Sequence, residues 1–249
     1  MARDMMTKVG EFATQLEQGL GGNLVSFLLY GPAVRDEGTG DATTLLVVND
    51  TSPSALRPIE PHVANWCKKG NPPPLIFSFR EWRSSTDVFP IEIEDMREAH
   101  ILIRGEDPLA EVVTTRADLR RELEREIRGK LLQLRTEFTA AASDGKALGT
   151  LLLASARTFF ILFRATLRLV GEKAPQEPGA LVAGIAAVSD LDATCFDWIL
   201  QRMAGEKNAN LTAYDPVGDR YLLQIERLAE FVDSFDVTSA ESAQQQGST

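Results

Sequence analysis

The chain has 249 residues, of which 44% are hydrophobic and 25% are charged, with 18 glycines, 12 prolines and 2 cysteines. This composition is typical of a globular protein and excludes a disordered, collagen-like or disulfide-stabilised chain. The 36 acidic and 26 basic residues give a formal net charge of −10, which argues against a surface built as a whole to bind phosphates, so we expect partners other than nucleic acid.

The charge is unevenly distributed along the chain. Residues 1–114 carry 10 basic and 17 acidic groups, residues 115–173 carry 12 and 7, and residues 174–249 carry 4 and 12. The hydrophobic pattern also changes near residue 115, from short apolar runs to long helical stripes. We therefore predict an α/β domain over 1–114, a helical domain over 115–238 and a disordered Ser/Gln/Gly-rich tail over 239–249.

Apolar runs bounded by glycine, proline and polar residues predict the elements of the first domain. In chain order these are a helix over 12–20, a strand over 23–30, a turn-rich linker over 31–41, a strand over 43–48, a helix from Pro53 to about Lys69, strands over 75–79 and 88–94, and a short apolar segment over 101–103. The strand over 88–94 is inferred from Ile91 and Ile93, which alternate with Glu92 and Glu94. These elements predict a mixed sheet of four or five strands.

The second half of the chain has the pattern of helices. Between Leu119 and Phe138, apolar residues recur at steps of three and four, which is the stripe of an amphipathic helix. Further helices are predicted at about 147–170, 178–189, 191–204 and 218–235. The predicted fold class is therefore α+β, with a mixed sheet and its helices followed by an antiparallel helical bundle.

The segment 147–170 is long and apolar enough to span a bilayer. Arg157, Arg164 and Arg168 interrupt it, so we interpret it as a buried helix. The first residues lack the apolar core of a secretory signal. We expect a cytoplasmic protein without a membrane partner.

Two strands and the linker between them resemble the opening of the polymerase-beta-like nucleotidyltransferase superfamily. The first strand ends in Tyr30-Gly31, and the second reads Thr44-Leu45-Leu46-Val47-Val48. Segments 87–92 and 102–109 look like later strands of bacterial members that carry a C-terminal helical domain, and 124–132 looks like the first helix of that domain. The resemblance implies a Gly-Ser pair near the nucleotide phosphates and an Asp-x-Asp pair that holds the metal ions.

This chain departs from the family pattern at the positions of the metal-binding aspartates and the phosphate-binding serine. Aligning the second strand places Ala42 and Thr44 where the two aspartates are expected, and Pro32 where the serine is expected. Magnesium in such sites needs carboxylates as well as substrate phosphates. Gly31 still allows close backbone approach to a ligand. The leading hypothesis is therefore a catalytically inactive protein with no metal or other cofactor, which binds a nucleotide or a protein partner.

The alternative is an active, Mg²⁺-dependent nucleotidyltransferase that uses unconventional carboxylates on a small molecule or protein. Asp41 is the first candidate, although it is offset by one residue and would lie on the opposite strand face. Glu92 and Glu94 are the others, because carboxylates two residues apart on a strand share a face. The competing interpretation is that both glutamates lie on a solvated strand face.

A stripe of arginines on the first long helix is a second candidate binding feature. Arg121, Arg125, Arg128 and Arg135 are spaced by four, three and seven residues, and guanidinium groups bind phosphate well. With Gly31, the first three are our candidate nucleotide-binding residues. The alternative is that these arginines pair with Glu122, Glu124 and the acidic first domain. A homodimer or a protein partner could also use the apolar bundle.

Other catalytic chemistry has little support in the sequence. The two histidines, His62 and His100, both precede residue 115, so the helical half has no imidazole for acid-base catalysis. Cys67 and Cys195 are far apart in sequence and are predicted to be free thiols. The chain has no phosphate-binding loop, dinucleotide fingerprint or zinc spacing.

Overall fold

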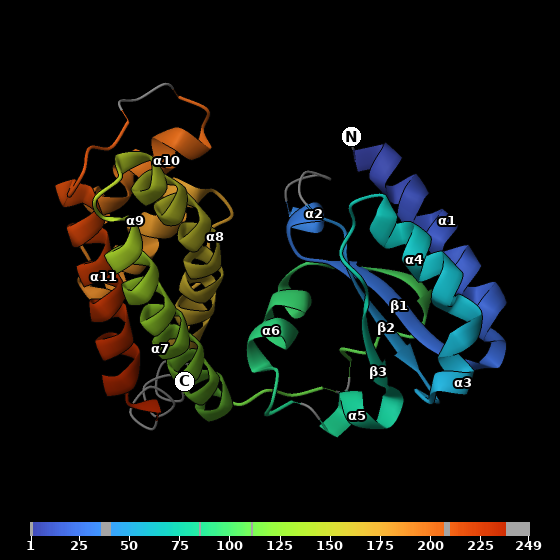
Figure 1. Ribbon diagram of the computed structural model, residues 1–249. Helices are drawn as coiled ribbons and strands as arrows, with labels where there is room; N and C mark the ends of the chain where they lie inside the picture. The colour runs from blue at the N-terminus through green and yellow to red at the C-terminus, as the bar shows by residue number, and fades with distance from the viewer. Residues whose placement is uncertain (1, 36–40, 85, 111, 207–209, 238–249) are drawn as a thin grey trace. The chain divides into compact units, whose positions relative to one another are not determined.

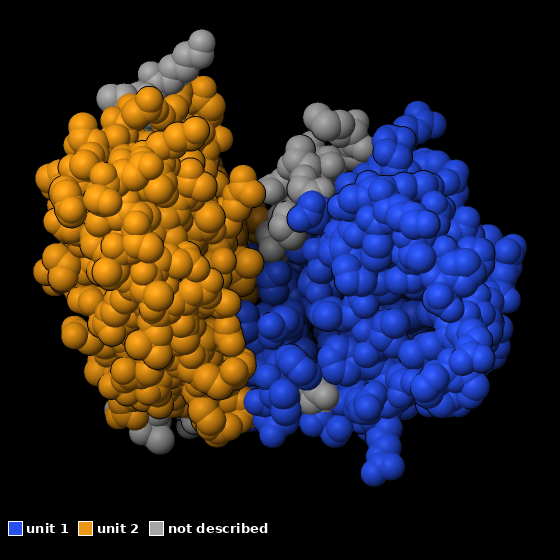
Figure 2. Space-filling model, in the orientation of Figure 1, with its two compact units in different colours: residues 1–115 blue, residues 116–249 orange. Residues whose placement is uncertain are grey.

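The computed structural model describes residues 2–35, 41–84, 86–110, 112–206 and 210–237. The chain divides into two compact units, Met1–Thr115 and Arg116–Thr249 (Figure 2). The tail predicted over 239–249 lies outside the described residues.

The first unit is built on a four-stranded mixed sheet. Its strands are β1 (Leu24–Tyr30), β2 (Thr43–Val48), β3 (Leu75–Ser78) and β4 (His100–Gly105), in the order β3-β2-β1-β4. β1 pairs antiparallel with β2 and β4, whereas β2 and β3 are parallel. The strands predicted from the apolar runs at 23–30, 43–48 and 75–79 are confirmed, and the short apolar segment over 101–103 forms part of β4.

Two helices, α1 (Ala2–Leu20) and α4 (Glu60–Lys68), cover one face of this sheet (Figure 1). Phe12 and Trp66 come from these helices and pack in one core with Phe27 and Leu46 of the strands. The predicted helix from Pro53 is divided into α3 (Pro53–Leu56), η2 (Arg57–Ile59) and α4. The other helical segments of this unit are η1 (Gly21–Asn23), α2 (Pro32–Arg35), α5 (Phe79–Ser84) and α6 (Pro90–Glu98).

The opposite face of the sheet has a second core. Leu28, Leu45 and Val47 of the strands pack there with Trp82 of α5 and with the α6 side chains. The indole Nε1 of Trp82 donates a hydrogen bond of 2.7 Å to the carbonyl of Pro108. This bond satisfies a buried polar group and fixes α5 over this face.

The prediction of a strand over 88–94 is wrong, because these residues contribute to the helix α6. Pro90 is its first residue, a position that suits proline because the first turn leaves its N–H groups unpaired. Ile93 and Met96 are fully buried, three residues apart, as one side of a helix requires. The alternation of isoleucine and glutamate was too short to distinguish a strand from a helix buried on more than one side.

The second unit is helical, as predicted. Its helical segments are α7 (Arg116–Ala141), α8 (Gly145–Val170), α9 (Pro178–Ser189), η3 (Ala193–Phe196), α10 (Asp197–Met203) and α11 (Pro216–Ser234). Carboxylates of Asp144, Glu177 and Asp215 accept hydrogen bonds from the first free N–H groups of α8, α9 and α11. Phe196 of η3 packs against Phe163 of α8 and Tyr221 of α11, so the short 3-10 helix contributes to the core.

Helix α8 is, among the described helices, the one long and apolar enough to cross a membrane by composition. Half of its most apolar window (50%) is buried inside the structure. Phe159 and Phe163 lie on that buried side. The core helix of a folded unit passes the same test of length and composition.

We expect the thiol of Cys195 to be unreactive in the folded protein. Cys195 is 1% exposed. Its burial raises the pKa of the thiol to about 12, and the nearby charge of Asp192 adds to this effect. Because the thiolate is the reactive form, a thiol reagent at pH 8 should modify Cys195 only after unfolding. Mass spectrometry of native and denaturant-treated samples measures this, and rapid native labelling of Cys195 would contradict the burial.

Candidate functional site

A tight turn at the end of β1 is the centre of the candidate site. Gly31 has a φ of +78°, a left-handed conformation that favours glycine. Its carbonyl accepts a hydrogen bond of 3.1 Å from the N–H of Val34 as α2 begins. A Cβ at Gly31 would lie 3.7 Å from Oγ1 of Thr43. The first residue of β2 therefore lies directly beside the turn.

The pairing of β1 with β2 decides which residues of β2 face the turn. Tyr30 is the partner of Thr43, and Leu29 is the partner of Thr44. Leu29 belongs to the core beneath α1 and α4, whereas Tyr30 belongs to the core on the other face. Because side chains alternate along a strand, Thr43 lies on the Tyr30 face and Thr44 on the helix-covered face.

This register places the two aligned positions, Ala42 and Thr44, on the helix-covered face of β2. Ala42 and Thr44 are 0% exposed, and Ala42 packs in the core with Leu46 and Val48. A carboxylate at position 42 or 44 would lie in an apolar interior instead of beside Gly31. Thr43, the β2 residue beside the turn, is partly exposed, and Asp41, two positions before it, is exposed.

The buried hydroxyl of Thr44 gives a direct test of this register. Its Oγ1 has no hydrogen-bond partner within the part of the chain that the structure describes. An unpaired buried polar group is costly, so Thr44→Val should raise the free energy of unfolding by about 1 kcal/mol. Urea denaturation measures the change, and a loss of stability on losing the hydroxyl would mean that it has a partner.

The two glutamates that were candidate ligands lie on α6 instead of on a strand. Glu94 accepts hydrogen bonds from the guanidinium of Arg97, at 2.5 Å, and from the hydroxyl of Thr114. It therefore has a structural role in holding the segment that follows β4. Glu92 is exposed on the same helix, so the shared strand face expected for these two residues does not exist.

Acidic charge acts on the end of β1. Burial is the main cause that raises the pKa of the Tyr30 phenol above its ordinary value, and the charges of Glu92 and Asp95 add to it. Tyr30 immediately precedes Gly31. The charges of Glu92 and Asp95 on α6 therefore act on the residue next to the turn. Glu92 was a candidate from the sequence, but as a residue of a strand that does not exist.

The residues at the turn do not fit a two-metal centre. No group of three or more His, Cys, Asp or Glu side chains is placed to hold a metal ion in the described part of the chain. Thr43, the residue of β2 beside the turn, provides a neutral hydroxyl and no carboxylate. Hard divalent ions are held in such sites by carboxylates and substrate phosphates, so Asp41 alone supplies too few ligands.

The arginine stripe of α7 is used in ion pairs within the second unit. Arg121 lies 3.1 Å from Asp118, Arg128 lies 3.1 Å from Glu124 and 3.0 Å from Asp233, and Arg135 lies 2.8 Å from Glu226. Arg125 pairs with Glu122 and Glu126. Exposed pairs of this kind contribute little to stability because water and salt screen them. They favour the structural interpretation of the stripe, with partners in its own unit.

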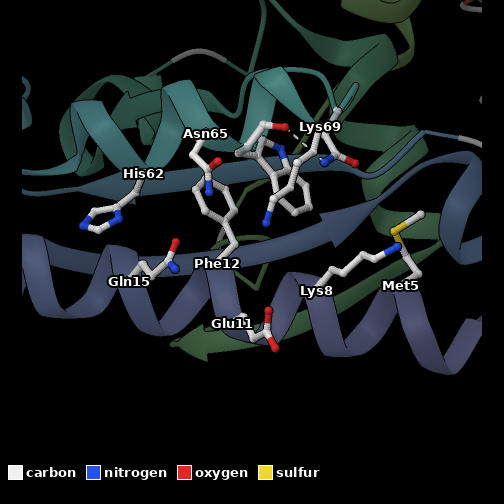
Figure 3. Close-up of a pocket in the computed structure, with 10 residues that line it drawn as sticks. Met5, Lys8, Glu11, Phe12, Gln15, His62, Asn65 and Lys69 are labelled. Atoms are coloured by element: carbon white, nitrogen blue, oxygen red, sulfur yellow. Dashed lines mark hydrogen bonds between the residues drawn. The ribbon is translucent and has the colours of Figure 1, made fainter.

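The two histidines lie at different places in the first unit. Nδ1 of His100 is 2.9 Å from the carbonyl of Met96, and its Nε2 is 3.5 Å from the carboxylate of Asp107. His62 lines a groove between α1 and α4, which the sequence did not indicate. Figure 3 shows that groove, with His62 on α4 facing Gln15 on α1.

The fold is similar to that of a solved protein, the spectinomycin adenyltransferase AAD(9) from Enterococcus faecialis. That protein was crystallised with ATP and spectinomycin. The match has a TM-score of 0.58 and 13% sequence identity, and it covers 92% of this chain and 100% of that chain. This chain therefore shares the fold of that adenyltransferase, and the similarity supports the expected resemblance at the level of the fold. No family model matches the chain. No curated protein matches it in sequence.

Proposed function

We propose that this chain is a nucleotidyltransferase-like protein that binds a nucleotide beside Gly31 and does not transfer it. The observation that carries this proposal is the position of Thr43, which lies next to the turn and offers a neutral hydroxyl instead of a carboxylate. The similar solved protein contains ATP, which supports a nucleotide as the ligand class.

The physical reason concerns charge at the reacting phosphate. In-line displacement at a phosphate is assisted by a pair of metal ions that stabilise the attacking and leaving oxygens. Asp41 and Thr43 cannot hold such a pair. Gly31 provides steric access for a phosphate group, and its left-handed backbone keeps that access open. Binding without transfer is the function that these residues support.

A transfer assay tests the inactivity. The protein is incubated with ATP labelled at the α-phosphate, Mg²⁺ and spectinomycin as the acceptor, and labelled products are separated from ATP. We expect no labelled acceptor and no labelled protein above the signal without enzyme. Transfer that Asp41→Asn abolishes would overturn the proposal.

The second candidate is an active transferase that uses Asp41 with the carboxylates of α6. The charge of Glu92 at Tyr30 favours it, since this glutamate acts at the end of β1. In the same assay, metal-dependent transfer that is lost in Glu92→Gln and retained in Glu98→Gln would support this candidate. Glu98 is a matched control because it is an exposed glutamate on the same helix.

A further inference from the structure

The groove between α1 and α4 has the features of a second, separate binding site. Its volume is about 220 Å³, which is below the range of about 300–1,000 Å³ for sites of drug-sized ligands. Phe12 and Trp66 form its floor, with ring centroids 4.5 Å apart and an angle of 4° between the rings. Trp66 donates a hydrogen bond of 2.9 Å from Nε1 to the carbonyl of Pro72, which fixes the floor.

Polar side chains from both helices line the groove above this floor. α1 contributes Glu11 and Gln15, α4 contributes His62 and Asn65, and Lys69 follows directly at the end of α4 (Figure 3). On each helix these residues are three or four positions apart, so each set lies on one side of its helix. The two sets converge because Phe12 and Trp66 pack α1 against α4.

These groups are not used to hold the described structure together. The side chains of Glu11, Gln15, His62, Asn65 and Lys69 form no hydrogen bond or ion pair within the described residues, whereas Lys8 in the same groove pairs with Asp4 at 2.6 Å. The groove therefore offers one uncommitted ammonium, one uncommitted carboxylate, one uncommitted imidazole and two uncommitted amides. Glu11 and Lys69 do not form an ion pair with each other, so their opposite charges are complementary to a ligand that carries both charges.

We propose that this groove binds a zwitterion of amino-acid size with a polar side chain. The ligand carboxylate would accept hydrogen bonds from the Lys69 ammonium, and the ligand ammonium would donate to the Glu11 carboxylate. The amides of Gln15 and Asn65 can each donate and accept, so a side-chain amide such as that of glutamine matches them. The apolar part of the ligand would lie over the Phe12 and Trp66 floor.

Calorimetric titration of the full chain tests the proposal with L-glutamine and two derivatives that each lack one charge. N-acetyl-L-glutamine lacks the ammonium, and L-glutaminamide lacks the carboxylate. We expect saturable binding of glutamine and at least about tenfold weaker binding of both derivatives. Absence of saturable binding, or equal binding of all three compounds, would overturn the proposal.

A pair of variants locates the site. Lys69→Ala should weaken glutamine binding by at least about tenfold, whereas Lys68→Ala should leave it unchanged within a factor of about two. Both lysines are exposed near the end of α4, but only Lys69 lines the groove. Equal losses in both variants would indicate nonspecific attraction and overturn the proposal. Nucleotide binding at Gly31 is measured separately and does not enter this test.

Discussion

Replacing Thr44 by aspartate is expected to unfold or strongly destabilise the first unit, while the same replacement at Thr43 leaves it folded. Thr44 is 0% exposed and lies on the sheet face that α1 and α4 cover. A carboxylate there would be a buried, unpaired charge, which costs about 3–5 kcal/mol. Thr43 lies beside the Gly31 turn and is partly exposed, so its replacement should cost about 1 kcal/mol or less.

Urea denaturation followed by tryptophan fluorescence measures this difference. Trp66 and Trp82 lie in the first unit and Trp198 in the second, so a Trp198→Phe background reports on the first unit alone. Both aspartate variants are compared with that background. A smaller loss for Thr44→Asp than for Thr43→Asp would show that β2 has the opposite register.

Replacing Gly105 by alanine is expected to cost roughly 2–5 kcal/mol of stability. Gly105 ends β4 with a φ of +78°, and a Cβ there would lie 1.9 Å from the carbonyl oxygen of Val25. The left-handed backbone disfavours alanine, and the carbonyl belongs to the neighbouring strand, so the pairing of β1 with β4 must shift. The same urea experiment measures the loss.

Gly70→Ala separates the two causes. Gly70 has a φ of +87°, but a Cβ there would have no neighbour within 4 Å among the described residues, so alanine should cost only the strain of the left-handed backbone, about 1–2 kcal/mol. The difference between the two variants reports the clash with Val25. Equal losses would mean that the strand pairing accommodates the added methyl group.

The helices of the second unit could be predicted because their signal extends over many turns. The stripe from Leu119 to Phe138 repeats without interruption, and its buried members lie on one side of α7. α6 has only nine residues, and its isoleucines are two positions apart. In so short a segment, the choice between helix and strand depends on packing against Trp82. The local hydrophobic pattern contains no information about that contact.

The candidate site was predicted only in part. Gly31 was identified because it ends an apolar run and is followed by turn residues. Thr43 was not named from the sequence, because the alignment of the second strand pointed to Ala42 and Thr44. The face of β2 that lies beside the turn is the one that α1 and α4 do not cover. Which face these helices cover is decided by tertiary contacts. The signal that the sequence offered was that Asp41 and Thr43 are two positions apart, as residues on one face of a strand are.

Calorimetric titration of the protein with ATP, with and without Mg²⁺, tests the central claim most directly. Because the β2 residue beside the Gly31 turn, Thr43, has no carboxylate, we predict saturable ATP binding whose affinity changes by less than about twofold when Mg²⁺ is added. Tightening by about tenfold or more with Mg²⁺ would reveal a carboxylate site for the metal. That result, or an absence of ATP binding in both conditions, would contradict metal-independent nucleotide binding.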